Sequence, residues 1–226
     1  MSESHEESQG SGRGGSGRTH AIRRHGLRVE SLRSGDFTIN APATDDSSNV
    51  GPVDFILFTP KVNDNENAIP AIKPMVGENT LVLTLQNGVD NGDRLAEVVG
   101  KEHVLVGIVY VHSIIKTPGI IWEMGTLTKV IFGEMDPGVS QRCQKLSTQL
   151  SAAGWPVELA EDMPALLWTK FVFVAAASAV CSATGSPGAS YGELRTTPET
   201  RQILREAMEE TAAVGRGLGM KLPQDV

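Results

Sequence analysis

The chain has 226 residues, 40% hydrophobic side chains and a formal net charge of -7 at pH 7. Its length allows one large domain or two small ones, and its hydrophobic content is sufficient for a buried core. The acidic balance argues against a general nucleic-acid surface or a surface for anionic membranes, so we expect neither nucleic acid nor a membrane as a partner.

The N-terminal segment is polar and low in complexity. Residues 1–19 are rich in Ser, Gly and Glu with almost no apolar side chains, which predicts a disordered tail and no secretory signal. The stretch from Gly10 to Gly15 matches the letters of a dinucleotide-binding fingerprint. We interpret the match as a coincidence, because no apolar strand precedes it and no helical pattern follows it. A Gly-rich cofactor loop is therefore not recognisable.

Residues 20–161 carry the signals of an α/β domain. Two short strands, Leu27–Ser31 and Phe37–Asn40, are expected on either side of a turn at Gly35. Beyond them, apolar runs predict strands buried on both faces of a sheet, and the segments between these strands predict helices. The strands are Val53–Thr59, Thr80–Leu85 and Val104–Val111, and the helices are Glu66–Val76 and Arg94–Val99. This alternation indicates a Rossmann-like parallel sheet with right-handed crossovers.

The remainder of this domain is expected to hold a hairpin, a helix and a last strand. Gly119–Trp122 and Leu127–Phe132 predict the hairpin, and residues 155–160 predict the strand. The helix between them buries Cys143 and ends at Gly154, a suitable C-terminal cap. Both cysteines of the chain lie in apolar helical patterns, which favours reduced thiols in a cytoplasmic protein.

The chain after Asp162 is expected to be wholly helical, so we place a domain boundary there and assign residues 162–226 to an all-α domain. Its first helix is apolar on every side, but we interpret it as too short and too interrupted by polar residues to span a membrane. A second helix is expected to begin at Pro198, with the Thr197 hydroxyl as its N-terminal cap.

Lys170 is the only charged side chain between Asp162 and Glu193. Desolvation disfavours an ammonium ion, so a lysine fixed in an apolar helix should release its proton more readily, as a general acid must. The alternative is that Lys170 extends along the helix surface into water.

Polar residues also follow two of the predicted parallel strands. Asn87 and Gly88 come after Thr80–Leu85, at the sheet edge where open α/β folds bind ligands, and Lys61 follows Val53–Thr59 in the same way. Glycine there permits close approach of the backbone, and an asparagine amide both donates and accepts hydrogen bonds. The alternatives are an ordinary turn and a surface lysine.

Together these segments resemble the ketopantoate reductase family, the NADP-dependent 2-dehydropantoate 2-reductases. The resemblance rests on Val53–Lys61, Leu85-Gln86-Asn87-Gly88-Val89, Phe132-Gly133-Glu134 and Leu167-Trp168-Thr169-Lys170-Phe171, and it extends through Gly192-Glu193-Leu194 to Gly219. It implies an oxidoreductase of pantothenate biosynthesis that reduces ketopantoate, or a similar small 2-oxo acid, with NADPH.

The resemblance also implies roles for individual residues. Lys170 would be the catalytic general acid, Lys61, Asn87 and Gly88 would contact NADP, and Asn87 and Ser178 would contact the substrate. No metal is expected. Two positions depart from the family pattern: Val174 and Ser178 stand where well-studied members often have asparagines that hold the substrate. A small 2-oxo acid is therefore a firmer expectation than ketopantoate itself.

Other departures concern the ends of the chain. In the family, a strand, a helix and a second strand precede the segment at Ala21, and further helices follow the position of Val226. We therefore expect an incomplete Rossmann-like domain followed by a truncated all-α domain that exposes apolar surface, forms a homodimer or belongs to a longer product. The alternative to an enzyme is a non-catalytic remnant that serves as an interaction module, and NADP versus NAD stays open.

Overall fold

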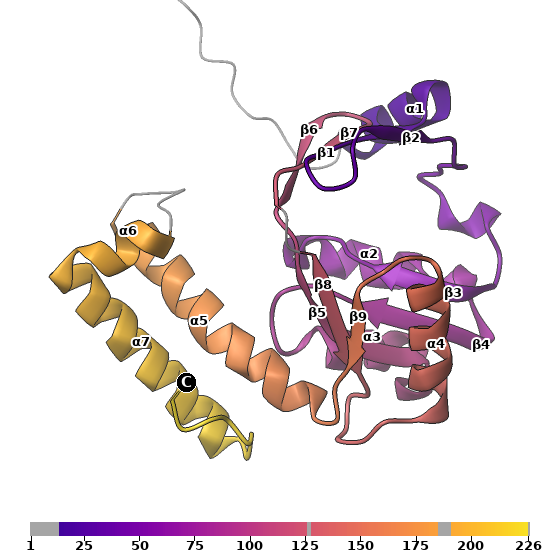
Figure 1. The fold of residues 1–226 in the computed structure, drawn as a ribbon. Helices are drawn as coiled ribbons and strands as arrows, with labels where there is room; N and C mark the ends of the chain where they lie inside the picture. The colour runs from indigo at the N-terminus through magenta and orange to yellow at the C-terminus, as the bar shows by residue number, and fades with distance from the viewer. Residues whose placement is uncertain (1–13, 126–127, 185–190, 226) are drawn as a thin grey trace, which may run out of the picture.

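The computed structural model describes residues 14–125, 128–184 and 191–225, in which strands are interspersed with helices up to β9 and helices alone follow (Figure 1). The helices are α1 Gly14–His25, α2 Asn65–Ala71, α3 Asn91–Val99, α4 Gln141–Ala152, α5 Met163–Ala183, α6 Tyr191–Thr196 and α7 Pro198–Gly217. The strands are β1 Leu27–Ser31, β2 Phe37–Ile39, β3 Val53–Phe58, β4 Val76–Thr84, β5 Val104–Tyr110, β6 Ser113–Thr117, β7 Ile120–Glu123, β8 Lys129–Gly133 and β9 Val157–Leu159. Short 3-10 helices at Ser47–Asn49, Val62–Asp64, Lys73–Met75 and Lys101–His103 lie between them.

A five-stranded sheet in the order β3-β4-β5-β8-β9 forms the α/β part of the molecule. Strands β3, β4 and β5 are parallel, β8 is antiparallel to β5, and β9 is parallel to β8. The three predicted parallel strands are therefore confirmed, and the complete sheet is mixed. Gly107 lets β5 and β8 pair closely, because a Cβ atom there would lie 2.8 Å from the Ile131 carbonyl oxygen.

Both faces of this sheet are covered, which explains why its strands are continuously apolar. On one face, Ile69 and Ile72 after the start of α2 and Leu95 of α3 pack against side chains of β3, β4 and β5. On the other face, Cys143 and Leu146 of α4 pack against the alternate side chains of the same sheet. The helix predicted around Cys143 is confirmed, and Gly154 follows it with φ +86.

A second sheet, in the order β2-β1-β7-β6, lies apart from the first (Figure 1). Its β1 and β2 strands pair as predicted. The hairpin predicted from Gly119–Trp122 and Leu127–Phe132 is wrong: β7 pairs with β6 across a turn at Gly119, and β8 joins β5 in the other sheet. The physical reason is burial, because Val130 and Phe132 of β8 are fully enclosed between α4 and the sheet.

The predicted tail falls mainly on residues 1–13, which lie outside the described residues, as does the start of the Gly10–Gly15 stretch. From Gly14 onward the chain is helical, so the expectation that no helix follows this stretch, and that the tail extends to residue 19, is wrong. Helix α1 ends before Gly26, which has φ +75 and whose missing Cβ makes room for Thr38 and Asn40.

The chain after β9 is helical among the described residues, as expected. Asp162 caps α5 by accepting a hydrogen bond from the Ala165 backbone N–H at 3.1 Å. Helix α7 begins at Pro198 as predicted, but the Thr197 hydroxyl makes no capping bond. Gly215 lets α7 approach α5 closely, because a Cβ atom there would lie 2.9 Å from the Trp168 ring.

Helix α5 has 21 residues and is long and apolar enough to cross a membrane, so the expectation that it is too short was wrong. The same length and composition occur in core helices of soluble proteins. Its buried residues are Met163, Ala165, Val172, Ala176, Ala177 and Val180. Met163 packs against the sheet together with α2 and α3, whereas Ala176, Ala177 and Val180 pack against α6 and α7. Helix α5 thus joins the sheet to the helical part of the molecule.

Candidate active site

The turn after β4 lies at the carboxyl end of the parallel strands, with β3 and β5 on either side. Leu85 and Gln86 are buried, whereas Asn87 is exposed. Gly88 has φ +117, in the region where glycine is favoured because it has no Cβ atom. The turn therefore exposes its backbone and the Asn87 side-chain amide at the sheet edge where open α/β folds bind ligands.

A buried amide network holds this turn in place. The Gln86 side-chain NH2 donates to the Pro60 carbonyl oxygen at 2.7 Å and to Asn65 Oδ1 at 2.8 Å. Asn65 Nδ2 donates to Asn91 Oδ1 at 2.9 Å, and Asn91 Nδ2 donates to the Asn87 carbonyl oxygen at 3.0 Å. The ends of β3 and β4 and the starts of α2 and α3 are thereby connected by side chains that have their partners inside the protein.

Replacing Asn65 by leucine is expected to lower the free energy of unfolding by about 2 kcal/mol, because it leaves the buried amides of Gln86 and Asn91 each short of one partner. Urea denaturation measures the change. Asn67→Leu, at an exposed position of the same helix, is the matched control and should change the free energy by less than about 0.5 kcal/mol. Equal effects of the two substitutions would show that the network does not stabilise the turn.

Lys170 lies midway along α5 and turns toward the end of β5. Its ammonium donates to the Val109 carbonyl oxygen at 3.1 Å and lies 5.3 Å from the centre of the Tyr110 ring. The side chain is half-buried, and this burial lowers the pKa of the Lys170 ammonium below its ordinary value. The interpretation of Lys170 as a lysine extended into water is therefore the weaker one, because a backbone carbonyl and an aromatic ring fix the ammonium.

Lys170 and the turn after β4 line one narrow cleft of about 10 Å³ between α5 and the sheet. Gln86, Asn87 and Gly88 form one wall, and the other lining residues are Ile108, Leu167, Lys170, Phe171 and Val174. The described residues that line it include no carboxylate, and among them Lys170 carries the only charge. The fold therefore brings together two segments, 83 residues apart between Asn87 and Lys170, that the sequence analysis named as candidates.

The structure does not bring every predicted site residue to this cleft. Lys61 is exposed directly after Pro60, whose carbonyl oxygen bonds Gln86, so it lies beside the turn rather than in the cleft. Ser178 is exposed two helical turns beyond Lys170, and its carbonyl oxygen accepts a hydrogen bond from the Ser182 hydroxyl. Sequence reasoning missed Asn65 and Asn91. Their position at helix starts shortly after strand ends was the available signal.

Glu134, in the Phe132-Gly133-Glu134 segment, belongs to a separate ion pair. Arg142 donates from Nε to Glu134 Oε1 at 2.8 Å and from a terminal nitrogen to the second oxygen, and Ser140 also donates to this carboxylate. These hydrogen bonds lower the pKa of Glu134 to about 2, with Arg142 as the largest cause. The pair connects the end of β8 to the start of α4, so its role is structural.

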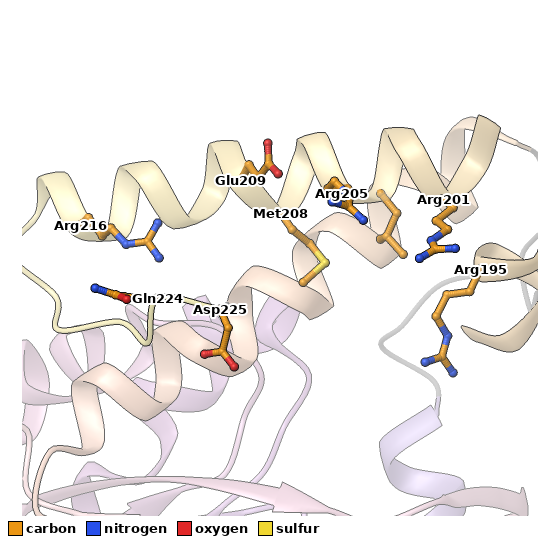
Figure 2. Close-up of a pocket in the computed structure, with 9 residues that line it drawn as sticks. Arg195, Arg201, Arg205, Met208, Glu209, Arg216, Gln224 and Asp225 are labelled. Carbon is orange, nitrogen blue, oxygen red and sulfur yellow. The ribbon is translucent and has the colours of Figure 1, made fainter. Parts of the chain in front are cut away.

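A groove of about 530 Å³ lies elsewhere, between α6, α7 and the C-terminal residues Gln224 and Asp225 (Figure 2). It is lined by exposed side chains of both charges over an apolar floor. The lining residues are Arg195, Leu204, Arg201, Arg205, Met208, Glu209, Arg216, Gln224 and Asp225. None of the predicted site residues lies in it. Among the described residues there is also no group of three or more His, Cys, Asp or Glu side chains placed to hold a metal ion.

Comparison with known proteins gives consistent matches. The family model described as ketopantoate reductase PanE/ApbA matches residues 13–137, and the model of its C-terminal part matches residues 162–226. The 2-dehydropantoate 2-reductase of Nostoc sp. is 27% identical over 200 residues, which are 86% of this chain and 61% of the relative. The chain spans about half to three fifths of the curated relatives that it matches.

Two solved structures share the fold over most of this chain. A ketopantoate reductase from Ralstonia eutropha superposes with a TM-score of 0.80 at 33% identity, over 92% of this chain and 66% of that one. The 2-dehydropantoate 2-reductase of Porphyromonas gingivalis superposes with a TM-score of 0.81 at 30% identity, over 92% of this chain and 71% of that one.

Proposed function

Because the chain belongs to the ketopantoate reductase family, we propose that its cleft is the site of an oxidoreductase that reduces ketopantoate, or a similar small 2-oxo acid, to the 2-hydroxy acid. One observation carries the proposal. The half-buried ammonium of Lys170 and the Asn87-Gly88 turn line the same cleft at the carboxyl end of the parallel strands.

Lys170 is the proposed general acid. A carbonyl carbon that accepts hydride leaves negative charge on its oxygen, and a cation held in a cleft of low polarity stabilises that charge. The Val109 carbonyl accepts one of the three ammonium hydrogens, so two remain to face a substrate. The lowered pKa of Lys170 makes the transfer of one of them to the developing alkoxide easier.

The turn residues fit a nicotinamide cofactor. Gly88 leaves backbone open to a ligand, Asn87 offers an exposed amide to a ribose, and exposed Lys61 can approach a phosphate from the neighbouring strand end. When bound, a reduced nicotinamide supplies the hydride. We propose NADPH as this cofactor because of the family. NADH is the alternative.

The proposal includes two substrate contacts, one in the cleft and one outside it. Asn87 would contact the reacting end of the 2-oxo acid beside the cofactor ribose. Ser178, further along α5, would reach only the far end of a longer substrate, because it is exposed and does not line the cleft. A homodimer, a cytoplasmic location and a role in pantothenate biosynthesis follow from the same family reasoning.

A fluorescence titration with NADPH tests the cofactor site. We expect a dissociation constant in the micromolar range, and Asn87→Ala or Lys61→Ala should each raise it about tenfold, the effect of losing one hydrogen bond to a charged or polar group. Asn67→Ala, exposed on α2, is the control that should leave it unchanged. Absence of binding at millimolar NADPH would favour the competing interpretation, a non-catalytic module.

A further inference from the structure

The part of the cleft next to Lys170 is apolar on the helix side and on the sheet side. Leu167 and Val174 are one turn before and after Lys170 on α5, and Phe171 is adjacent to it, so all three accompany the ammonium along the cleft. Ile108 of β5, which is buried, forms the opposite surface. A group attached to the substrate carbonyl would therefore contact carbon atoms.

The polar side chains that line the cleft already have hydrogen-bond partners or proposed roles. The Gln86 side chain donates to Pro60 and Asn65, and its oxygen accepts from the Thr84 hydroxyl at 3.1 Å. Lys170 keeps two hydrogens for the reacting carbonyl and the carboxylate. Asn87 serves the cofactor and the same reacting end. With Lys170 and Asn87 in these proposed roles, no other side chain among the described residues that line the cleft is left to bond a hydroxyl group on the rest of the substrate.

We propose that the preferred substrate is a 2-oxo acid with a wholly apolar side chain, and that Val174 sets this preference. The proposal rests on the function proposed above and narrows its substrate class. Ketopantoate carries a hydroxyl group that would lose its bonds to water beside Val174 without gaining a partner. Since an apolar pocket rejects an added hydroxyl by up to about a hundredfold, we expect a preference of tenfold or more for the acid that lacks it.

Trimethylpyruvate and ketopantoate provide a matched pair, because they differ only by this hydroxyl group. Their dissociation constants are measured by isothermal titration calorimetry on the whole chain saturated with NADPH, and their kcat/KM values are compared wherever turnover is measured. We expect the wild-type protein to bind trimethylpyruvate at least tenfold more tightly. Equal binding, or tighter binding of ketopantoate, overturns the proposal and leaves the proposed function intact.

Two substitutions test the role of Val174. Val174→Asn keeps a similar volume and adds a donor and an acceptor, so the ratio of the two dissociation constants should fall below about threefold. Val174→Ala removes bulk without adding a polar group and should leave the ratio at tenfold or more. An unchanged ratio in Val174→Asn overturns the assignment of Val174. If NADPH binds and neither acid does, the proposed function itself fails.

Discussion

Lys170→Met is expected to lower kcat for 2-oxo acid reduction by about a hundredfold to ten-thousandfold, the usual loss when a general acid is removed. Methionine keeps the length and apolar stem of the side chain, so α5 should pack as before. The dissociation constant of NADPH should change little, because the ammonium bonds the Val109 carbonyl and its proposed role is toward the substrate rather than the cofactor. Loss of NADPH absorbance measures turnover, and the fluorescence titration measures binding.

The pH dependence of the same reaction shows whether Lys170 acts in its protonated form. The acid must be protonated to act, and burial lowers the pKa of Lys170, so turnover should fall as the pH rises through that lowered pKa. Lys170→Arg is the conservative control. Arginine keeps the positive charge but does not release its proton, so any residual activity should show no such fall. A fall of unchanged position in Lys170→Arg would assign it to another group.

Arg142→Ala is expected to lower the free energy of unfolding by about 3 kcal/mol, because it leaves the Glu134 carboxylate largely buried without its cation. The Glu134 and Arg142 side chains are only 17% and 29% exposed, so solvent screens the pair weakly. Lys145→Ala, exposed on the same helix, is the control and should have an effect below about 0.5 kcal/mol. Urea denaturation at neutral pH compares them, and equal losses would contradict the assignment.

The same pair predicts how stability depends on pH. Hydrogen bonds from Arg142 and Ser140 lower the pKa of Glu134 from 4.5 to about 2 in the folded protein. A lowered folded-state pKa means that the stabilisation is fully present above pH 4.5 and is lost as the pH falls toward 2. The wild-type protein should therefore lose about 3 kcal/mol over this range, and Glu134→Gln should lose less. A loss of equal size in both proteins would exclude Glu134 as its source.

Much of the sheet could be predicted from the sequence, because a parallel strand covered on both faces needs a continuous apolar run. Val82, Leu83, Val104 and Leu105 are all fully buried, and each lies in a predicted strand. The pairing of β7 and β8 could not be predicted in the same way. Both strands are short and apolar, so their own residues do not show which sheet each one joins. The two sheets compete for the more apolar strand, and this competition decides which strand each one pairs with.

The candidate site was predicted in part for a similar reason. The sequence identifies Asn87 because it follows a buried strand, and Lys170 because it is the one charged residue in an apolar helix. Both are local signals. The amides of Asn65 and Asn91 give only a weak local signal, their position at helix starts shortly after strand ends, because their importance arises when two helix starts and two strand ends meet around Gln86. Exposure of Ser178 likewise depends on how α5 packs against α7.

Label transfer most directly tests the central claim that the cleft beside Lys170 carries hydride transfer to a carbonyl group. The protein is incubated with trimethylpyruvate and NADPH deuterated at the transferable position, and the product is observed by NMR. We expect deuterium on the carbon next to the carboxylate with the wild-type protein and only background label with Lys170→Met. Equal label with both proteins, or a product without deuterium, would contradict the account.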